Sequence, residues 1–89
     1  MIAHTSHAAV TTRLKRAQGH LKSIVKMLEE DRECLEIAQQ LQAVEKAIVN
    51  AKKVLVHDHI DNCLEQAVRD GSRNSKDTIR EFQEITRYL

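Results

Sequence analysis

Apolar residues recur along the first third of the chain at alternating steps of four and three residues. The series runs through Val10, Leu14, Ala17, Leu21, Ile24 and Leu28. This spacing is the heptad pattern of a helix that buries one stripe of side chains. Thr5 or Ser6 can cap its start, and the polar cluster from Glu29 to Arg32 marks a turn after it. The pattern therefore predicts a first helix between these two signals.

A longer periodic stretch begins near Glu33. Its apolar stripe follows the same steps and then shifts to a second face; its members are Cys34, Ile37, Leu41, Val44, Ile48, Ala51 and Leu55, and then Val56, Ile60, Cys63 and Ala67. Nothing between Glu33 and Val68 breaks a helix, so this second helix would be about 50 Å long at about 1.5 Å per residue. A helix of that length cannot bury its stripe inside an 89-residue monomer. We therefore expect a partner helix of the same kind from a second subunit.

A third, shorter helix is expected near the end of the chain. Gly71 is a candidate C-cap for the second helix, and Asn74 or Ser75 can cap the third. The stripe of the third helix consists of Thr78 or Ile79, Phe82, Ile85 or Thr86, and Leu89. The chain has no proline and only one Tyr and one Phe, which is a poor composition for a β-sandwich or barrel. We predict an all-α fold of three helices in a single domain spanning residues 1–89, with the long second helices of two subunits packed antiparallel.

The net charge of +1 hides a basic segment in the first helix. Between Val10 and Leu28 the chain has five basic residues and no acidic ones: Arg13, Lys15, Arg16, Lys22 and Lys26. Such a segment indicates a polyanionic partner, although a solvated helix face is the alternative. Stacking aromatics are scarce, so the phosphates of double-stranded DNA are a better expectation than a single strand. The candidate DNA contacts are Arg13, Lys15 and Arg16, with Lys52 and Lys53 from the second helix.

Cys34, His59 and Cys63 are the candidate metal ligands. His59 and Cys63 are four residues apart, so on a helix their side chains share one face. Cys34 lies about 37 Å away along a continuous helix, so one chain cannot bring all three residues to one ion. In an antiparallel pair of helices, Cys34 of one chain meets His59 and Cys63 of the other, and the twofold symmetry creates two equal sites.

Two thiolates and one imidazole form a soft donor set. It suits Cu(I) in a three-coordinate site, or Ni(II) or Zn(II) with a further ligand, and it excludes hard cations. His4 and His7 are candidate further donors, whereas His57 points to another face and is interpreted as a surface histidine. The alternative is that both cysteines are ordinary core residues, because both lie on apolar stripes.

Several classes of protein are not expected from this sequence. No apolar run approaches the length of a membrane span, and the first ten residues lack the apolar block of a signal peptide. We therefore expect a cytoplasmic protein with reduced thiols and no membrane partner. An enzyme is not expected, because no nucleophile–base pair with an orienting group and no phosphate loop is present.

The sequence resembles the CsoR/RcnR family of metal-sensing repressors over nearly the whole chain. The resemblance rests on R-L-K-R-A-Q-G-H at 13–20, on Cys34, on A-V-E-K-A-I at 43–48 and on D-H-I-D-N-C at 58–63. Within the family, the pattern is most similar to the branch linked to nickel resistance. The resemblance implies three helices per subunit and a dimer of antiparallel long helices, two of which form a tetramer.

The same resemblance implies a function. The apo protein would bind operator DNA and would be released on binding Cu(I) or Ni(II), so that efflux or resistance genes are expressed. Cys34, His59 and Cys63 match the metal ligands of the family, and Arg13 and Arg16 match basic positions implicated in DNA contact.

The chain departs from the family pattern at three positions. Glu33 replaces a tyrosine that often precedes the first cysteine of copper sensors, and Ile2 occupies the place of an N-terminal histidine in nickel and cobalt members. Asn50 stands where an arginine often lies, so Lys52 or Lys53 is expected to supply that charge. A thiol-sensing or electrophile-sensing repressor of the same fold and a metal buffer without a DNA role remain as alternatives.

Overall fold

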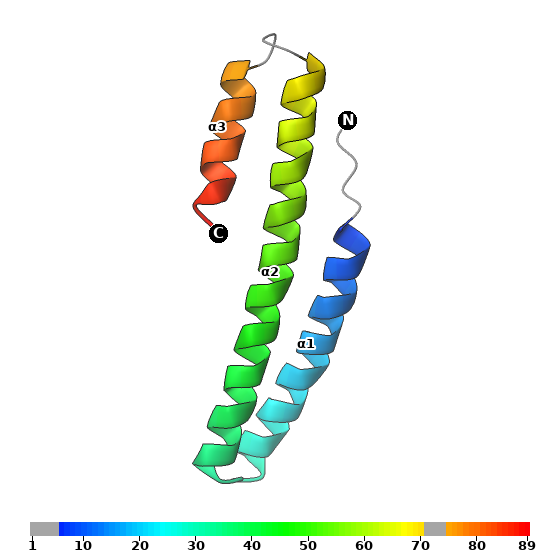
Figure 1. Ribbon diagram of the computed structural model, residues 1–89. Coiled ribbons are helices and arrows are strands. Elements are labelled where there is room, and N and C mark those ends of the chain that lie inside the picture. The colour runs from blue at the N-terminus through cyan, green and yellow to red at the C-terminus, as the bar shows by residue number, and fades with distance from the viewer. Residues whose placement is uncertain (1–5, 71–74) are drawn as a thin grey trace.

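The computed structural model describes residues 6–70 and 75–89, and within these ranges it contains three helices and no strand. Helix α1 spans His7–Glu29, α2 spans Cys34–Asp70 and α3 spans Ser75–Thr86. Figure 1 shows α1 running antiparallel along the first part of α2, while α3 folds back beside its last part. Both flanking helices contact α2, and in the described ranges they do not contact each other. The prediction of an all-α fold with three helices is confirmed.

The turn between α1 and α2 is a Schellman motif built without glycine. The Asp31 N–H donates to the carbonyl of Leu28 at 3.2 Å, and the Arg32 N–H donates to that of Met27 at 3.0 Å. Asp31 adopts a left-handed conformation with φ of 53°, which aspartate tolerates better than most residues. The polar cluster after the first stripe therefore forms the predicted turn.

The start of α1 differs from the prediction. Ser6 occupies the N-cap position, and its carbonyl accepts a hydrogen bond from the Val10 N–H at 2.8 Å, but its side chain makes no capping bond. The Ser6 hydroxyl instead donates to Asp58 Oδ2 in α2, at 2.8 Å. A carboxylate is a stronger acceptor than a neutral group, so the predicted side-chain cap is wrong at Ser6. Of the other predicted caps, Thr5, Gly71 and Asn74 lie outside the described residues. Ser75 is the first residue of α3 rather than the residue before it.

The core between α1 and α2 uses only half of each predicted apolar stripe. Buried positions recur every seven residues: Val10, Ala17 and Ile24 in α1, and Ile37, Val44 and Ala51 in α2. Five leucine and isoleucine side chains at the alternate positions of the same stripes are 40–55% exposed; they are Leu14, Leu21, Leu28, Leu41 and Ile48. The subunit therefore carries an uncovered apolar row along α1 and α2.

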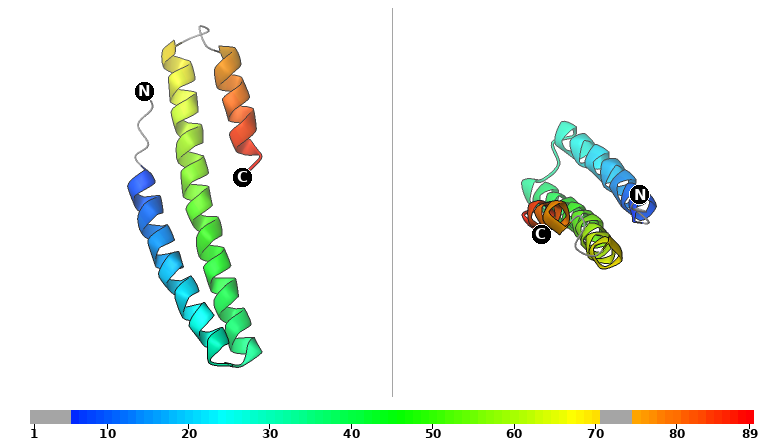
Figure 2. Two further views of the ribbon diagram at one scale, coloured as in Figure 1. Left: turned by 180° about the vertical axis from the view of Figure 1, so that it is seen from behind. Right: turned by 90° about the horizontal axis from the view of Figure 1, so that it is seen from above.

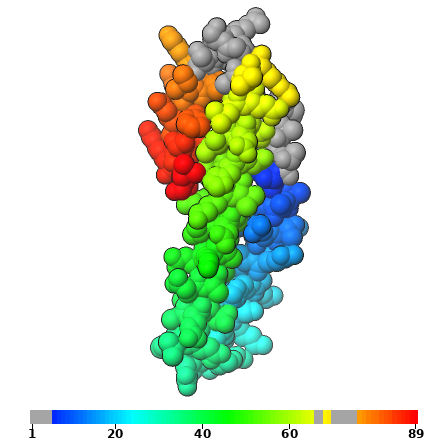
Figure 3. All heavy atoms as spheres, viewed as in Figure 1, coloured from blue at the N-terminus to red at the C-terminus, as the bar shows by residue number. Residues whose placement is uncertain are grey.

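The subunit is long and thin. Its principal extents are 59 × 22 × 13 Å and its radius of gyration is 18.1 Å, whereas a compact chain of this length would have about 12 Å. Figure 2 shows α1 and α3 beside different parts of α2, and on the face drawn in Figure 3 α2 is visible at the surface between them. In the described part of the chain, no helix has both the length and the apolar content that a membrane crossing requires.

Candidate metal centre

The three predicted ligands lie at opposite ends of α2. Cys34 is its first residue and is exposed, whereas His59 and Cys63 lie toward its other end. Because α2 is continuous between them, Cys34 and His59 are separated by about 37 Å along the helix axis. Of these three ligands, one chain therefore brings together only His59 and Cys63 within the described residues.

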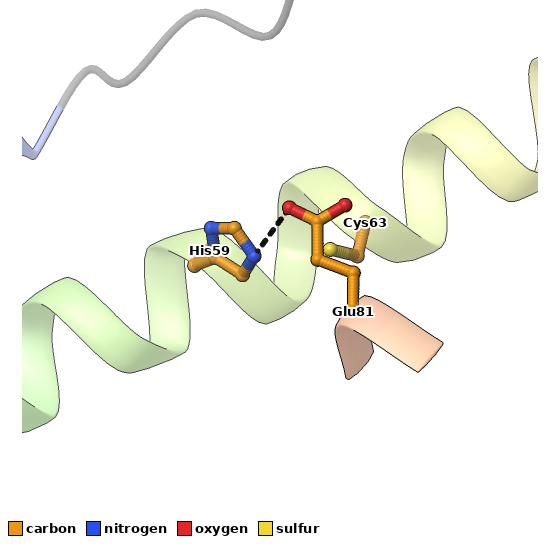
Figure 4. A group of neighbouring side chains, drawn as sticks. All are labelled: His59, Cys63 and Glu81. Atoms are coloured by element: carbon orange, nitrogen blue, oxygen red, sulfur yellow. Dashed lines mark ion pairs between the residues drawn. The ribbon is translucent and has the colours of Figure 1, made fainter. Parts of the chain in front are cut away.

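Glu81 of α3 joins this pair. Figure 4 shows its carboxylate pointing back toward α2, where the ligand atoms of His59, Cys63 and Glu81 all lie within 4.8 Å of one another. His59 Nε2 lies 2.9 Å from Glu81 Oε1. Glu81 was not predicted, although the α2–α3 hairpin offers a signal for it. Folding the third helix back on the second about the expected turn near Gly71 and Asn74 brings its middle opposite Cys63.

The three side chains differ strongly in burial. Cys63 is 2% exposed, while the side chains of His59 and Glu81 are 20% and 49% exposed. Burial raises the pKa of the Cys63 thiol, and the negative charge of Glu81 raises that pKa further. The thiol therefore holds its proton more firmly than an exposed cysteine, and a metal must displace that proton to bind the sulfur.

The chemistry of this group fits a transition metal. A thiolate and an imidazole on one helical turn provide two donors, and Glu81 can act as a further oxygen donor or orient the His59 ring. The other histidines are placed differently. His57 and His7 are exposed, neither belongs to the group, and His4 lies outside the described residues. His20 Nε2 lies 2.6 Å from Gln40 Oε1, across the α1–α2 interface.

The predicted DNA contacts divide into two sets. Arg13 and Arg16 line a hollow of about 230 Å³ between α1 and α2, together with Ala17, His20, Ala47 and Asn50. Lys15, Lys52 and Lys53 are exposed but are not among the residues lining that hollow. Asn50 and the two arginines thus line the same hollow, whereas Lys52 and Lys53 do not add their charge to it.

Comparisons with known proteins identify the family of the chain. The family model for metal-sensitive transcriptional repressors matches residues 6–88. The copper-sensing transcriptional repressor CsoR of Mycobacterium ulcerans is 43% identical over 63 residues, which cover 71% of this chain and 54% of that protein. CsoR of Bacillus subtilis is 34% identical over 80 residues, covering 88% of this chain and 79% of that protein.

A solved structure extends the similarity to the fold. The nickel-responsive transcriptional regulator InrS superposes with a TM-score of 0.84 at 27% identity, covering 98% of this chain and 97% of that one. The matched part of the chain spans about half the length of the mycobacterial relatives. The family match over residues 6–88, together with the motifs and the helical arrangement, shows that the chain belongs to the metal-sensitive transcriptional repressors.

Proposed function

We propose that this protein is a repressor that binds operator DNA in its metal-free form and releases it on binding Cu(I) or Ni(II). Cys34 of one subunit and His59 and Cys63 of another hold the metal, so each subunit contributes to two sites. The protein acts in the cytoplasm as a homodimer or a dimer of dimers. Release of the DNA allows metal efflux or resistance genes to be expressed.

One observation carries this proposal: α2 brings His59 and Cys63 together at one end and presents an exposed cysteine at the other. His59 and Cys63 supply one thiolate, whereas the proposed soft-metal site uses two. A second, antiparallel α2 supplies the missing thiolate at each end. The uncovered row that includes Leu14, Leu21 and Leu41 provides an apolar surface on which two subunits can associate.

This proposal has two versions, which differ in the metal that the site binds. Cu(I) is satisfied by the two thiolates and the imidazole in a three-coordinate site, with Glu81 holding the His59 ring. Ni(II) needs a further donor, which Glu81 or a histidine near the start of the chain, His4 or His7, supplies. Anaerobic titration separates the versions: a thiolate-to-nickel charge-transfer band from a planar four-coordinate complex favours Ni(II), and tight three-coordinate binding favours Cu(I).

The shared site is tested with a mixed dimer of one Cys34→Ala chain and one His59→Ala chain. Each variant alone loses a ligand from both symmetric sites. Its metal affinity should fall by more than the roughly 10- to 100-fold that loss of an outer-shell partner costs. In the mixed dimer one site lacks two ligands and the other is intact, so one tight site per dimer should return. His57→Ala, an exposed histidine of the same helix, is the control and should keep both sites.

The opposing outcome is equally clear. A folded mixed dimer that recovers no tight site would show that each chain binds its own metal, and the shared geometry would be wrong. A thiol switch that uses the two cysteines has less support than metal sensing. The burial of Cys63 and its raised pKa make it a poor nucleophile toward oxidants and electrophiles.

A further inference from the structure

A hydrogen bond joins the start of α1 to the helical turn that carries the metal pair. Ser6 Oγ donates to Asp58 Oδ2 at 2.8 Å, between residues 52 positions apart in the sequence, in a partly buried setting. Asn62 Nδ2 donates to the same oxygen at 3.4 Å. Asp58 directly precedes His59, and Asn62 directly precedes Cys63. One turn of α2 therefore holds the candidate metal donors and also contacts Ser6, the N-cap residue of α1.

The two contacts of this turn are made with different helices. His59 pairs with Glu81 of α3 at 2.9 Å, whereas Asp58 pairs with Ser6 at the start of α1. In the described ranges α1 and α3 do not contact each other. A rearrangement at the metal pair therefore reaches α1 through α2. The hydrogen bond from Ser6 to Asp58 is one direct contact between that turn and the start of α1.

The position of Ser6 affects the basic residues further along α1. The carbonyl of Ser6 accepts the first backbone bond of the helix, from the Val10 N–H at 2.8 Å. From there α1 continues unbroken through Arg13 and Arg16, which line the hollow against α2. Because a helix moves as a stiff unit over two turns, a shift at Ser6 changes where the two guanidinium groups lie.

Metal binding would constrain this turn of α2. In the structure the donors of His59, Cys63 and Glu81 lie within 4.8 Å of one another. An ion bound by both His59 and Cys63 would have to bring these two donors to bonding distance from a single atom. Metal binding would therefore restrict the geometry of the turn from which Asp58 reaches Ser6.

We propose that Ser6 and Asp58 are positioning residues that transmit metal occupancy at His59 and Cys63 to the DNA-contacting residues of α1. This inference rests on the proposed function. It identifies the contact through which the metal site in α2 would act on α1 of the same chain. Ser6 touches neither metal nor DNA in this scheme. Its loss should therefore change the coupling between the two ligands more than the affinity for either one alone.

The test measures how strongly metal weakens DNA binding. A fluorescent operator duplex, selected by binding from random-sequence duplexes, is titrated with the protein in the absence and presence of saturating Cu(I) or Ni(II). A ligand at one site of a protein commonly changes the affinity for a ligand at a second site by about 5- to 150-fold. Ser6→Ala should reduce the ratio of the two affinities by at least about fivefold. It should change metal affinity and metal-free DNA affinity by no more than about threefold, since removing one hydroxyl at the end of the helix leaves the helix folded.

Two variants separate the hydrogen bond from a general effect at the helix start. Ser6→Thr keeps the hydroxyl and should restore the parent ratio. Thr12→Ala removes a hydroxyl from the same helix that bonds only the local Ala8 carbonyl, at 3.1 Å, and should leave the ratio unchanged. Because Ser6 and Asp58 act as a pair, Asp58→Ala combined with Ser6→Ala should lower the ratio no further than Asp58→Ala alone.

A second measurement keeps the inference separate from the proposed function. Hydrogen exchange at the Val10 amide is followed with and without the metal alone, and no DNA is needed. The parent should show a metal-dependent change that Ser6→Ala loses and Ser6→Thr regains. If metal fails to weaken DNA binding by the parent, the proposed function is wrong, and this exchange measurement still decides the link. An unaltered ratio, or an unaltered exchange response, in Ser6→Ala would overturn the link itself.

Discussion

The two ends of α2 place the two cysteines in opposite surroundings. At the first end Cys34 is exposed, next to the turn from α1. At the other end Cys63 is 2% exposed beneath α3, beside His59 and Glu81. One end therefore exposes its cysteine to solvent, whereas the other buries its cysteine in a group of three side chains. The same residue type thus meets opposite environments at the two ends of one continuous helix, and the proposed shared site would use both.

The packing at the two ends differs in the same direction. The α1–α2 end is held by a cluster of buried side chains, which are Ala17, Ile24, Ile37 and Val44. At the α2–α3 end, α3 leaves an apolar hollow of about 160 Å³ beside Cys63, lined also by Leu64, Thr78, Ile79 and Phe82. We therefore expect packing at the α1–α2 end to determine the stability of the whole chain. The α2–α3 end is expected to tolerate changes in packing.

The largest expected effect compares one substitution at the two ends. Ile24 is 2% exposed in the α1–α2 cluster, and Ile79 is 56% exposed on α3. Ile24→Ala should lower the free energy of unfolding by about 2–5 kcal/mol, because it leaves a cavity in the core. Ile79→Ala should cost about 1 kcal/mol or less. Urea unfolding at fixed protein concentration measures both, and equal losses would contradict the proposed difference between the ends.

An intermediate effect is expected in the reactivity of the thiols. Iodoacetamide should alkylate Cys34 on the order of 10- to 100-fold faster than Cys63 in the metal-free protein at pH 8, since burial and a raised pKa both slow Cys63. Mass spectrometry of digested samples follows each cysteine separately. Unfolding in urea should make the two rates equal, which is the control. Equal rates in the folded protein would show that the ends do not differ in accessibility.

The pH dependence of that reaction sharpens the comparison. The thiolate is the reactive form, and the pKa of Cys63 lies above its ordinary value of 9.0, first from burial and then from Glu81. The rate at Cys63 should therefore keep rising above pH 9.0. In Glu81→Gln the negative charge is lost, so the midpoint of the Cys63 rate profile should move to lower pH.

The smallest expected effect concerns the basic residues between the two ends. Arg13→Ala and Arg16→Ala alter the hollow. Each should make the negative slope of log DNA affinity against log salt concentration shallower by about one. Metal affinity should not change. Lys52→Ala and Lys53→Ala alter exposed residues outside the lining of that hollow and serve as comparison variants. If both arginine variants keep the parent's salt slope, the basic segment of α1 is only a solvated helix face and does not contact DNA.

The helices themselves follow closely from the sequence. The apolar period and the polar break after Leu28 place the end of α1 and the start of α2 within about one residue. The period does not reveal which half of the stripe is covered. Leu21 and Ile24 both belong to the predicted stripe but are 40% and 2% exposed, because burial depends on where the neighbouring helix lies.

The candidate site is predictable only in part. The spacing of His59 and Cys63 identifies their pairing, since four residues on a helix bring two side chains together. Glu81 depends on how α3 docks, and the bond between Ser6 and Asp58 depends on contact between distant segments. The local sequence favoured a capping bond from the Ser6 side chain. The Ser6 hydroxyl instead donates to the Asp58 carboxylate of α2.

The unbroken course of α2 limits how this chain can vary in evolution. Inserting or deleting one residue between Cys34 and His59 would rotate one ligand position relative to the other by about 100°. A change of seven residues would nearly preserve the face but would alter the separation by about 10.5 Å. Neither change can be absorbed locally by a continuous helix. Relatives that keep the proposed ligand set are therefore expected to diverge by substitution in this stretch while its length stays constant.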